Sequence, residues 1–139
     1  MENIQENRII NIDINEILNR IYSESAFIYV TNPETFRLSS DQNKLVITKL
    51  HEGFAALARR ISGYTAAIDF SVTDLAIAVT LRSDPPAQSN LKTVVAENIK
   101  TDLTAYALMV FYHDHTPRYE NTWHSARSQL TAAFAIMDN

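Results

Sequence analysis

The chain has 139 residues, of which 46% are hydrophobic and 20% are charged, the balance of a single globular domain rather than of a disordered segment. Its net charge of −4 argues against a nucleic-acid binder, which neutralises phosphates with clustered cations, and against a peripheral anchor on an anionic membrane. The absence of cysteine excludes a disulfide scaffold and thiol chemistry and fits a cytoplasmic protein.

Glycine usage and the length of the apolar runs exclude further classes. Only Gly53 and Gly63 occur, so neither a P-loop nor a dinucleotide-binding fingerprint can be written, and we expect no cofactor. The N-terminus is polar and lacks the apolar core of a signal peptide. The longest dense apolar run, Ala105–Tyr112, is far shorter than the roughly 20 residues that span a bilayer, so we expect a soluble protein.

The first predicted element is a helix that follows a flexible N-terminal arm. Residues 1–10 are predicted to form the arm. Asp13 is suited to cap a helix, Glu16 completes a capping box, and Ile12 stands where a hydrophobic staple begins. Apolar residues then recur at helical spacing, which places the helix at about 13–25. They are Ile14, Ile17, Leu18, Ile21 and Tyr22.

The segment after this helix has two interpretations. Residues 26–31 either prolong the helix or form a short extended piece. Asn32 and Pro33 end the element in both cases, because a residue that precedes proline disfavours the helical conformation. Residues 32–38 are therefore predicted to be a loop.

A second helix is predicted at about 40–61. Ser39 and Gln42 form another capping box, and Gly63 is placed as a left-handed cap at the C-terminal end. The apolar residues between these signals repeat with a period near 3.6. They are Val46, Ile47, Leu50, Phe54, Leu57, Ala58 and Ile61.

The hydrophobic period changes from 3.6 to 2 within residues 65–82, which predicts a β-hairpin whose apolar face packs on the helices. The simplest connection is a two-residue turn at Thr73 and Asp74. Thr-Asp is not a preferred turn pair, so a longer loop is the alternative. The predicted cross-strand pairs are Val72 with Leu75, Phe70 with Ile77, and Ile68 with Val79.

Two further helices complete the predicted fold. Residues 83–86, which contain two prolines, end the hairpin, and a third helix is predicted at about 90–112. Thr116 and Pro117 begin a fourth helix as cap and first helical residue. The predicted class is α+β and mostly α, with about four helices, one hairpin between the second and third, and a single domain over residues 1–139. The stripe of the last helix is Tyr119, Trp123, Ala126, Leu130, Ala133, Phe134 and Met137.

The strongest metal candidate lies where the last two helices meet. His113, Asp114 and His115 occupy the junction, with Glu120 and His124 nearby. Imidazole and carboxylate ligands suit zinc or another transition metal. Their spacing matches no strong zinc signature, and polar residues are expected in a connecting loop. We therefore predict no metal site, and metal binding by the histidine segment stays the alternative.

No catalytic arrangement can be assembled from the sequence. There is no Gly-x-Ser-x-Gly elbow to expose a nucleophilic serine. The acids Glu16, Glu24, Glu97 and Asp102 are interpreted as caps and solvated helix faces rather than as a carboxylate pair across a cleft. We predict a protein without catalytic residues and without enzymatic activity.

Two features of the helices have a structural and a functional interpretation. A small basic strip on the second helix is interpreted as a solvated face, because it lacks the interleaved aromatics of a nucleic-acid platform. Contact with nucleic acid or with an acidic partner protein is the alternative. Trp123 and Tyr119 are interpreted as core residues, with anchors of a protein interface as the alternative. The basic strip consists of Lys44, Lys49, Arg59 and Arg60.

The order of three segments resembles a known family. A helix ends with Ala-Ala-Leu-Ala-Arg-Arg-Ile-Ser-Gly-Tyr (55–64), and a later helix contains Ile-Lys-Thr-Asp-Leu-Thr-Ala-Tyr-Ala-Leu-Met-Val-Phe-Tyr (99–112). A closing helix runs from Tyr119 to Met137. Over residues 12–137 this order resembles small uncharacterised prophage-encoded proteins and, more distantly, head–tail connector (adaptor) proteins of tailed phages. The resemblance implies a non-catalytic subunit that forms a ring between portal and tail.

The leading functional hypothesis is therefore a non-enzymatic structural subunit of virion assembly, located in the host cytoplasm or in the virion. Its expected partners are proteins, namely further copies of itself, the portal or tail proteins, and neither a membrane nor nucleic acid is expected. The alternative is a small cytosolic binding or regulatory module whose ligand the sequence does not identify.

Overall fold

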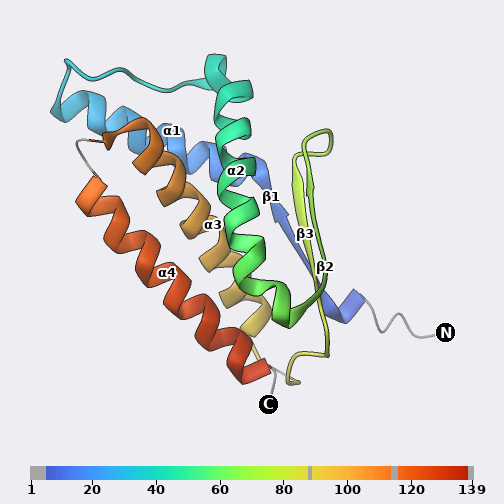
Figure 1. Ribbon diagram of the computed structural model, residues 1–139. Coiled ribbons are helices and arrows are strands. Elements are labelled where there is room, and N and C mark those ends of the chain that lie inside the picture. The colour runs from blue at the N-terminus through green and yellow to red at the C-terminus, as the bar shows by residue number, and fades with distance from the viewer. Residues whose placement is uncertain (1–5, 88, 114–115, 138–139) are drawn as a thin grey trace.

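In the residues that the structure describes, the chain forms four α-helices and one three-stranded antiparallel sheet (Figure 1). The computed structural model describes residues 6–87, 89–113 and 116–137. The prediction of an α+β, mostly helical class is confirmed. The helices are α1 (Ile14–Thr31), α2 (Asn43–Ile61), α3 (Leu91–Phe111) and α4 (Thr116–Met137). The strands are β1 (Ile9–Asp13), β2 (Thr65–Ser71) and β3 (Ala76–Leu81), and 3-10 turns are η1 (Glu6–Arg8), η2 (Ser40–Gln42) and η3 (Ser62–Tyr64).

Helix α1 begins at the predicted cap but continues beyond the predicted end. The Asp13 carboxylate accepts a hydrogen bond from the backbone N–H of Asn15 at 2.9 Å. Glu16 does not complete the expected capping box, because its carboxylate pairs with Lys100 of α3 at 2.7 Å. The ambiguous residues 26–31 are helical, and the helix ends where the N–H of Asn32 bonds to the carbonyl of Ile28.

Helix α2 begins as predicted and ends differently. The capping box of Ser39 and Gln42 is present, and η2 precedes the regular helix. The prediction for Gly63 is wrong, because neither glycine has a positive φ angle. The chain instead tightens into η3 and leads directly to β2, so the helix end requires no left-handed residue. The side chain of Thr65 supports this corner by donating a hydrogen bond to the carbonyl of Ile61 at 3.2 Å.

The sheet contains a strand that the sequence analysis did not predict. Residues 6–10, expected to belong to a flexible arm, instead form η1 and the start of β1, while residues 1–5 lie outside the described residues. Strand β1 pairs antiparallel with β3, from Ile9 opposite Thr80 to Asp13 opposite Ala76. Ile10 and Ile12 are consequently buried in the core, and the strand order is β1-β3-β2.

The predicted register of the hairpin is confirmed, and its turn is longer than the shortest alternative. Ile68 lies opposite Val79 and Phe70 opposite Ile77. The connection comprises the four residues 72–75, of which Leu75 has a positive φ of 51°. Val72 therefore lies in the loop with 53% of its surface exposed, instead of on the buried face where we expected it.

Helix α3 occupies the centre of the fold. It packs against the other three helices and against β1, and α4 covers the side of α3 that faces away from the sheet (Figure 1). Although α3 is extensively buried, neither it nor another helix of the described residues is long and apolar enough to cross a membrane. Its buried residues are Val95, Asn98, Ile99, Asp102, Leu103, Ala105, Ala107 and Leu108.

Helices α2 and α3 approach closely at Gly53. A Cβ atom at this position would lie 2.5 Å from Cδ1 and 2.9 Å from Cγ of Tyr106. Both ring atoms are near the root of the Tyr106 side chain, so relief of the contact requires a change in its χ1 angle or a movement of α3 away from α2. The absence of a side chain at Gly53 thus sets the distance between the two helices.

We predict that Gly53→Ala destabilises the protein by about 1–2 kcal/mol, because overpacking outweighs the helix propensity gained from alanine. Gly63→Ala is the matched control, because open space surrounds this position and the φ angle of Gly63 is not positive. The free energy of unfolding of this variant should equal that of the wild type or be slightly higher. Free energies of unfolding from urea titrations test both variants. Equal effects of the two substitutions would contradict the close-approach interpretation.

Candidate functional site

The structure does not bring the predicted metal candidates together in the residues that it describes. His113 lies directly after α3 and is exposed, while Asp114 and His115 are outside the described residues. Glu120 and His124 lie one turn apart on α4, with 3.7 Å between Oε1 and Nε2. Within the described ranges, no group of three or more histidines and acids is arranged to hold a metal ion.

Three of the acids interpreted as caps or solvated helix faces form ion pairs between helices. Glu16 of α1 pairs with Lys100 of α3 at 2.7 Å. Glu97 of α3 pairs with Arg20 of α1, and Glu24 of α1 pairs with Arg118 of α4 at 2.9 Å. Such partly exposed pairs add little stability individually. Their positions show that α1 is connected to both neighbouring helices along its polar face.

The interpretation of Asp102 as a solvated residue is wrong. Asp102 is only 2% exposed and lies on the face of α3 that α4 covers. Its Oδ1 accepts a hydrogen bond from Nε1 of Trp123 at 3.1 Å, and its Oδ2 has no hydrogen-bond partner among the described residues. Burial raises the pKa of Asp102 to about 6, although the Trp123 hydrogen bond and the charges of Arg127 and Arg60 oppose the shift.

Trp123 of α4 contacts both Asp102 and Arg127. Its indole N–H donates to Asp102, and the Arg127 guanidinium lies 4.1 Å from the centre of its ring, within cation–π distance. The half-buried ring packs against the core. Tyr119 is buried, as expected for the core interpretation of both residues.

The residues of the basic strip are separated in their contacts. Lys49 pairs with Glu52 on the same helix at 3.1 Å. Arg59 bonds to the carbonyl of Ala55 at 3.5 Å, and Arg60 is near enough to Asp102 to lower its pKa. Lys49, Arg59 and Arg60 thus each contact a different group.

A polar groove of about 540 Å³ lies between α1, α3 and α4. Tyr119 donates a hydrogen bond to Oε1 of Glu24 at 3.2 Å, and the same carboxylate pairs with Arg118. Burial, followed by the charge of Glu24, raises the pKa of Tyr119, so the phenol remains a neutral donor. The floor contains Ala105 and Leu108. The remaining lining residues are Asn19, Arg20, Ser23, Thr101, Thr104 and Thr122.

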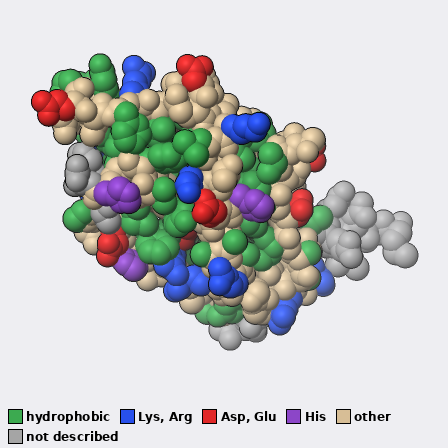
Figure 2. All heavy atoms as spheres, turned by 45° about the horizontal axis from the view of Figure 1, so that its top comes forward, with side chains coloured by type: hydrophobic (Ala, Val, Ile, Leu, Met, Phe, Trp, Pro, Cys, Tyr) green, Lys and Arg blue, Asp and Glu red, His purple; other side chains and the backbone are tan. Residues whose placement is uncertain are grey.

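An exposed apolar surface adjoins this groove at the C-terminal end of α1. Phe27 and Val30 are one helical turn apart and are 51% and 74% exposed, and Phe36 in the following loop is 51% exposed. We call these three residues the end patch. Figure 2 brings this end of the molecule forward and shows hydrophobic side chains at the surface there. The Arg118 guanidinium lies 5.6 Å from the centre of the Phe27 ring and connects the patch to the groove.

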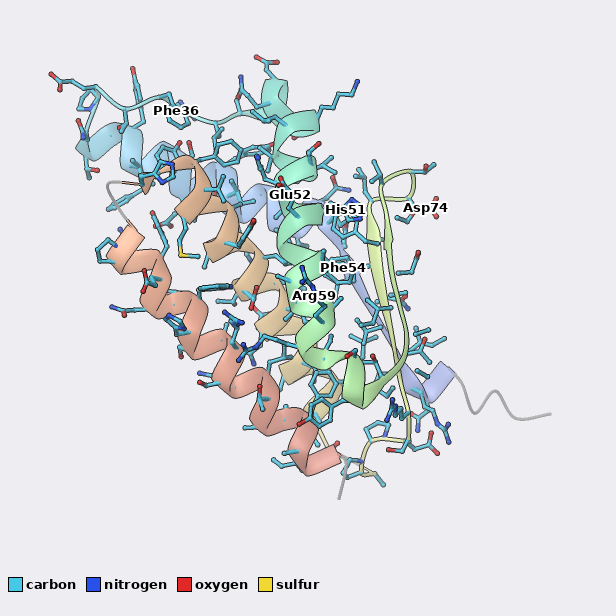
Figure 3. The ribbon with its side chains drawn as sticks, in the orientation of Figure 1. Phe36, His51, Glu52, Phe54, Arg59 and Asp74 are labelled. Atoms are coloured by element: carbon cyan, nitrogen blue, oxygen red, sulfur yellow. The ribbon has the colours of Figure 1, made fainter. Side chains whose placement is uncertain are left out.

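Buried polar contacts hold the end patch in place. The hydroxyl groups of Ser25 and Tyr112 are 2.6 Å apart, and the Ser25 hydroxyl accepts from the backbone N–H of Leu38 at 2.6 Å. The Tyr112 hydroxyl donates to the carbonyl of Phe36 at 3.1 Å, and the rings of Tyr112 and Phe36 stack with centroids 4.8 Å apart. The loop is thereby attached to α1 and α3, so the exposed ring of Phe36 (Figure 3) is presented from an ordered backbone.

Sequence reasoning missed the end patch although a signal was present. Phe27 and Val30 fall outside the buried stripe of α1, which contains Ser25 and Ile28 in the same stretch. A helical interpretation of residues 26–31 would have placed two large apolar residues on the solvent side. The extended alternative obscured this, because alternation assigns the residues to different faces.

No protein-family model matches the chain, and no curated protein or solved structure is significantly similar to it. A functional conclusion therefore depends on the surfaces described above.

The raised pKa of Asp102 predicts a specific pH dependence of stability. Because the folded-state pKa of about 6 exceeds the ordinary aspartate pKa of 3.8, the stabilising contribution is complete below pH 3.8 and is lost as pH rises through 6. In Asp102→Asn this loss is absent. The free energy of unfolding of the variant, relative to wild type, should rise by about 3 kcal/mol between pH 3.5 and pH 8.

Urea titrations across this pH range measure the difference. Asp69→Asn, which removes an exposed carboxyl group of β2, is the control. All other groups titrate alike in the wild type and in both variants, so their effects on stability cancel when the curves are subtracted. Parallel stability curves for wild type and Asp102→Asn would show that the buried carboxyl is not the source of the pH dependence.

Proposed function

We propose that the protein is a non-enzymatic structural subunit of prophage virion assembly that works as head–tail connectors do, by binding protein partners. The observation that carries this proposal is the end patch. Monomeric proteins expose scattered apolar residues, but adjacent large ones mark protein-interaction surfaces. Phe27 and Val30 are adjacent on one helix, and Phe36 is attached to the same helix end.

The chemistry of the end patch suits a partner protein. Burying apolar surface contributes roughly 25 cal/mol per Å², and the ordered backbone reduces the entropy lost on association. Arg118 and Glu24 lie at the border with the groove, where a polar rim adds specificity. In a closed ring this surface would contact a different surface of the next subunit or of the portal.

A second candidate function is a small cytosolic binding or regulatory module. The polar groove favours it, because its volume of about 540 Å³ lies within the range of small-molecule sites. Several hydrogen-bonding groups converge there, among them Tyr119, Glu24 and Arg118. A ligand of this groove would contact arginine and hydroxyl side chains as well as the apolar surface that includes Ala105 and Leu108.

We predict that Val30→Asp prevents incorporation of the protein into virions without changing its fold. Val30 is 74% exposed, so the free energy of unfolding should remain within about 0.5 kcal/mol of wild type. Ile136→Asp is the matched control: it alters an apolar residue that is 56% exposed near the end of α4, far from the end patch. The control should be incorporated like wild type.

Tagged forms are produced in a host carrying the parent prophage, and particles purified after induction are quantified by mass spectrometry. The wild-type protein should occur at low, fixed copy number beside the portal protein, and deletion of the gene should give heads without tails. If the protein is missing from particles and tailed virions form without it, the connector proposal fails and the binding-module alternative takes its place.

A further inference from the structure

Strand β2 is an edge of the sheet. The strand order is β1-β3-β2, and within the described residues no strand pairs with the outer side of β2. An edge strand presents unpaired N–H and C=O groups that can bind another extended chain. A bulge between Thr65 and Ala67 disturbs the start of the strand, so its regular part runs from Ala67 to Ser71.

A groove of about 380 Å³ accompanies this edge, between the last turn of α2 and the first half of β2. Small side chains leave the space open: Ala58 on α2, Ser62 at the start of η3, and Ala66 and Ala67 on the strand. Toward the C-terminal end of β2, aromatic side chains fill the space between α2 and the strand. His51 and Phe54 reach from α2 toward the hairpin (Figure 3), and their rings lie 4.8 Å and 5.4 Å from that of Phe70.

The two ends of β2 carry opposite charges. Arg59 lines the groove at the N-terminal end, where Nε of Arg82 donates to the carbonyl of Thr65 at 3.3 Å. Asp69 and Asp74 are exposed toward the C-terminal end. None of these four charged groups has an ion-pair partner among the described residues. The charges are therefore available to an external ligand.

The other edge of the sheet differs in this respect. A groove of about 350 Å³ runs between β1 and α3. Of the two lysines that line it, Lys92 and Lys100, Lys100 is already neutralised by Glu16 at 2.7 Å and Glu97 at 3.8 Å. In the groove beside β2, by contrast, the cation that lines the groove is Arg59, which has no ion-pair partner among the described residues.

We propose that β2 binds an extended peptide segment of another protein, antiparallel, with acidic residues toward the C-terminal end of the segment and basic residues toward its N-terminal end. This is an interaction site separate from the end patch and does not depend on the connector role. Antiparallel addition continues the pairing of the whole sheet. It places the C-terminal part of the segment beside Arg59 and Arg82, and the N-terminal part beside Asp69 and Asp74.

The two components of recognition have different roles. Main-chain hydrogen bonds along residues 67–71 supply affinity that is independent of sequence, while alternate side chains of the segment enter the groove beside α2. The opposite charges at the ends of the strand fix direction, because a reversed segment would place like charges together. Exposed charge pairs contribute little to the binding free energy. They therefore determine the direction of the bound segment more than its affinity.

The probe is a short synthetic peptide that begins with two lysines, continues with alternating threonine and valine and ends with two glutamates and a free carboxylate. Binding to the full chain is followed by fluorescence anisotropy. A second peptide exchanges the lysines and glutamates, and a third carries N-methyl groups on alternate amides. We expect the first peptide to bind, the charge-exchanged peptide to bind about tenfold more weakly, and the N-methylated peptide to lose binding.

Arg59→Glu should weaken binding of the first peptide about tenfold, because attraction is replaced by repulsion at one end of β2. Arg37→Glu, in the exposed loop between α1 and α2, is the matched control and should bind like wild type. Unchanged circular dichroism and urea midpoints confirm that both variants fold.

Binding of the N-methylated peptide with unchanged affinity would overturn the proposal, since addition to an edge strand requires the main-chain bonds. Equal binding of the charge-exchanged peptide would overturn the direction that we assign. Concentration-dependent dimerisation through β2, detected by sedimentation velocity without peptide, would show that the occupant is a second copy of the chain instead.

Discussion

The packing of α3 against every other layer is the constraint on which the remaining structure depends. Because α3 packs against α1, α2, α4 and β1, little of its surface faces solvent. Its side chains must therefore fit the surfaces of all of these elements. Toward α2 the match is the contact of Tyr106 with the bare backbone at Gly53. Toward α4 it is the pair of Asp102 and Trp123, and at the C-terminal end it is Tyr112 bonded to Ser25 of α1. The positions of the exposed surfaces follow from these contacts, because both the groove and the end patch lie where α3 meets α1.

Local patterns were sufficient to predict most of the fold. Helix starts were recognisable because capping uses residues that are neighbours in sequence, as Ser39 and Gln42 are. The hairpin register was predictable because cross-strand pairs such as Phe70 and Ile77 are fixed by alternation around a nearby turn. Strand β1 was not predictable in the same way. Its partner is distant in sequence, and the short alternation of Ile10 and Ile12 was interpreted partly as an arm and partly as a helix staple.

The candidate site was less predictable, because its important properties come from contacts between elements. Asp102 has the sequence context of an ordinary helical acid, and only the docking of α4 deprives it of solvent. Glu24 becomes a shared acceptor because Arg118 and Tyr119 approach it from a different helix. The end patch is an intermediate case: its residues are visible in the sequence, but their exposure depends on the buried stripe of α1 being correctly assigned.

The pairing of β1 with β3 has a consequence for biosynthesis. Ile9 is translated before its partner, Thr80, which follows roughly seventy residues later. At about 5–20 residues per second, this interval lasts several seconds, during which Ile10 and Ile12 have no sheet to enter. The segment that leads into α1 is thus translated before its partner strand β3 but can reach its native place only after β3 has been made. The three-stranded sheet can therefore form only after the hairpin of β2 and β3 has been translated, although β1 is already present.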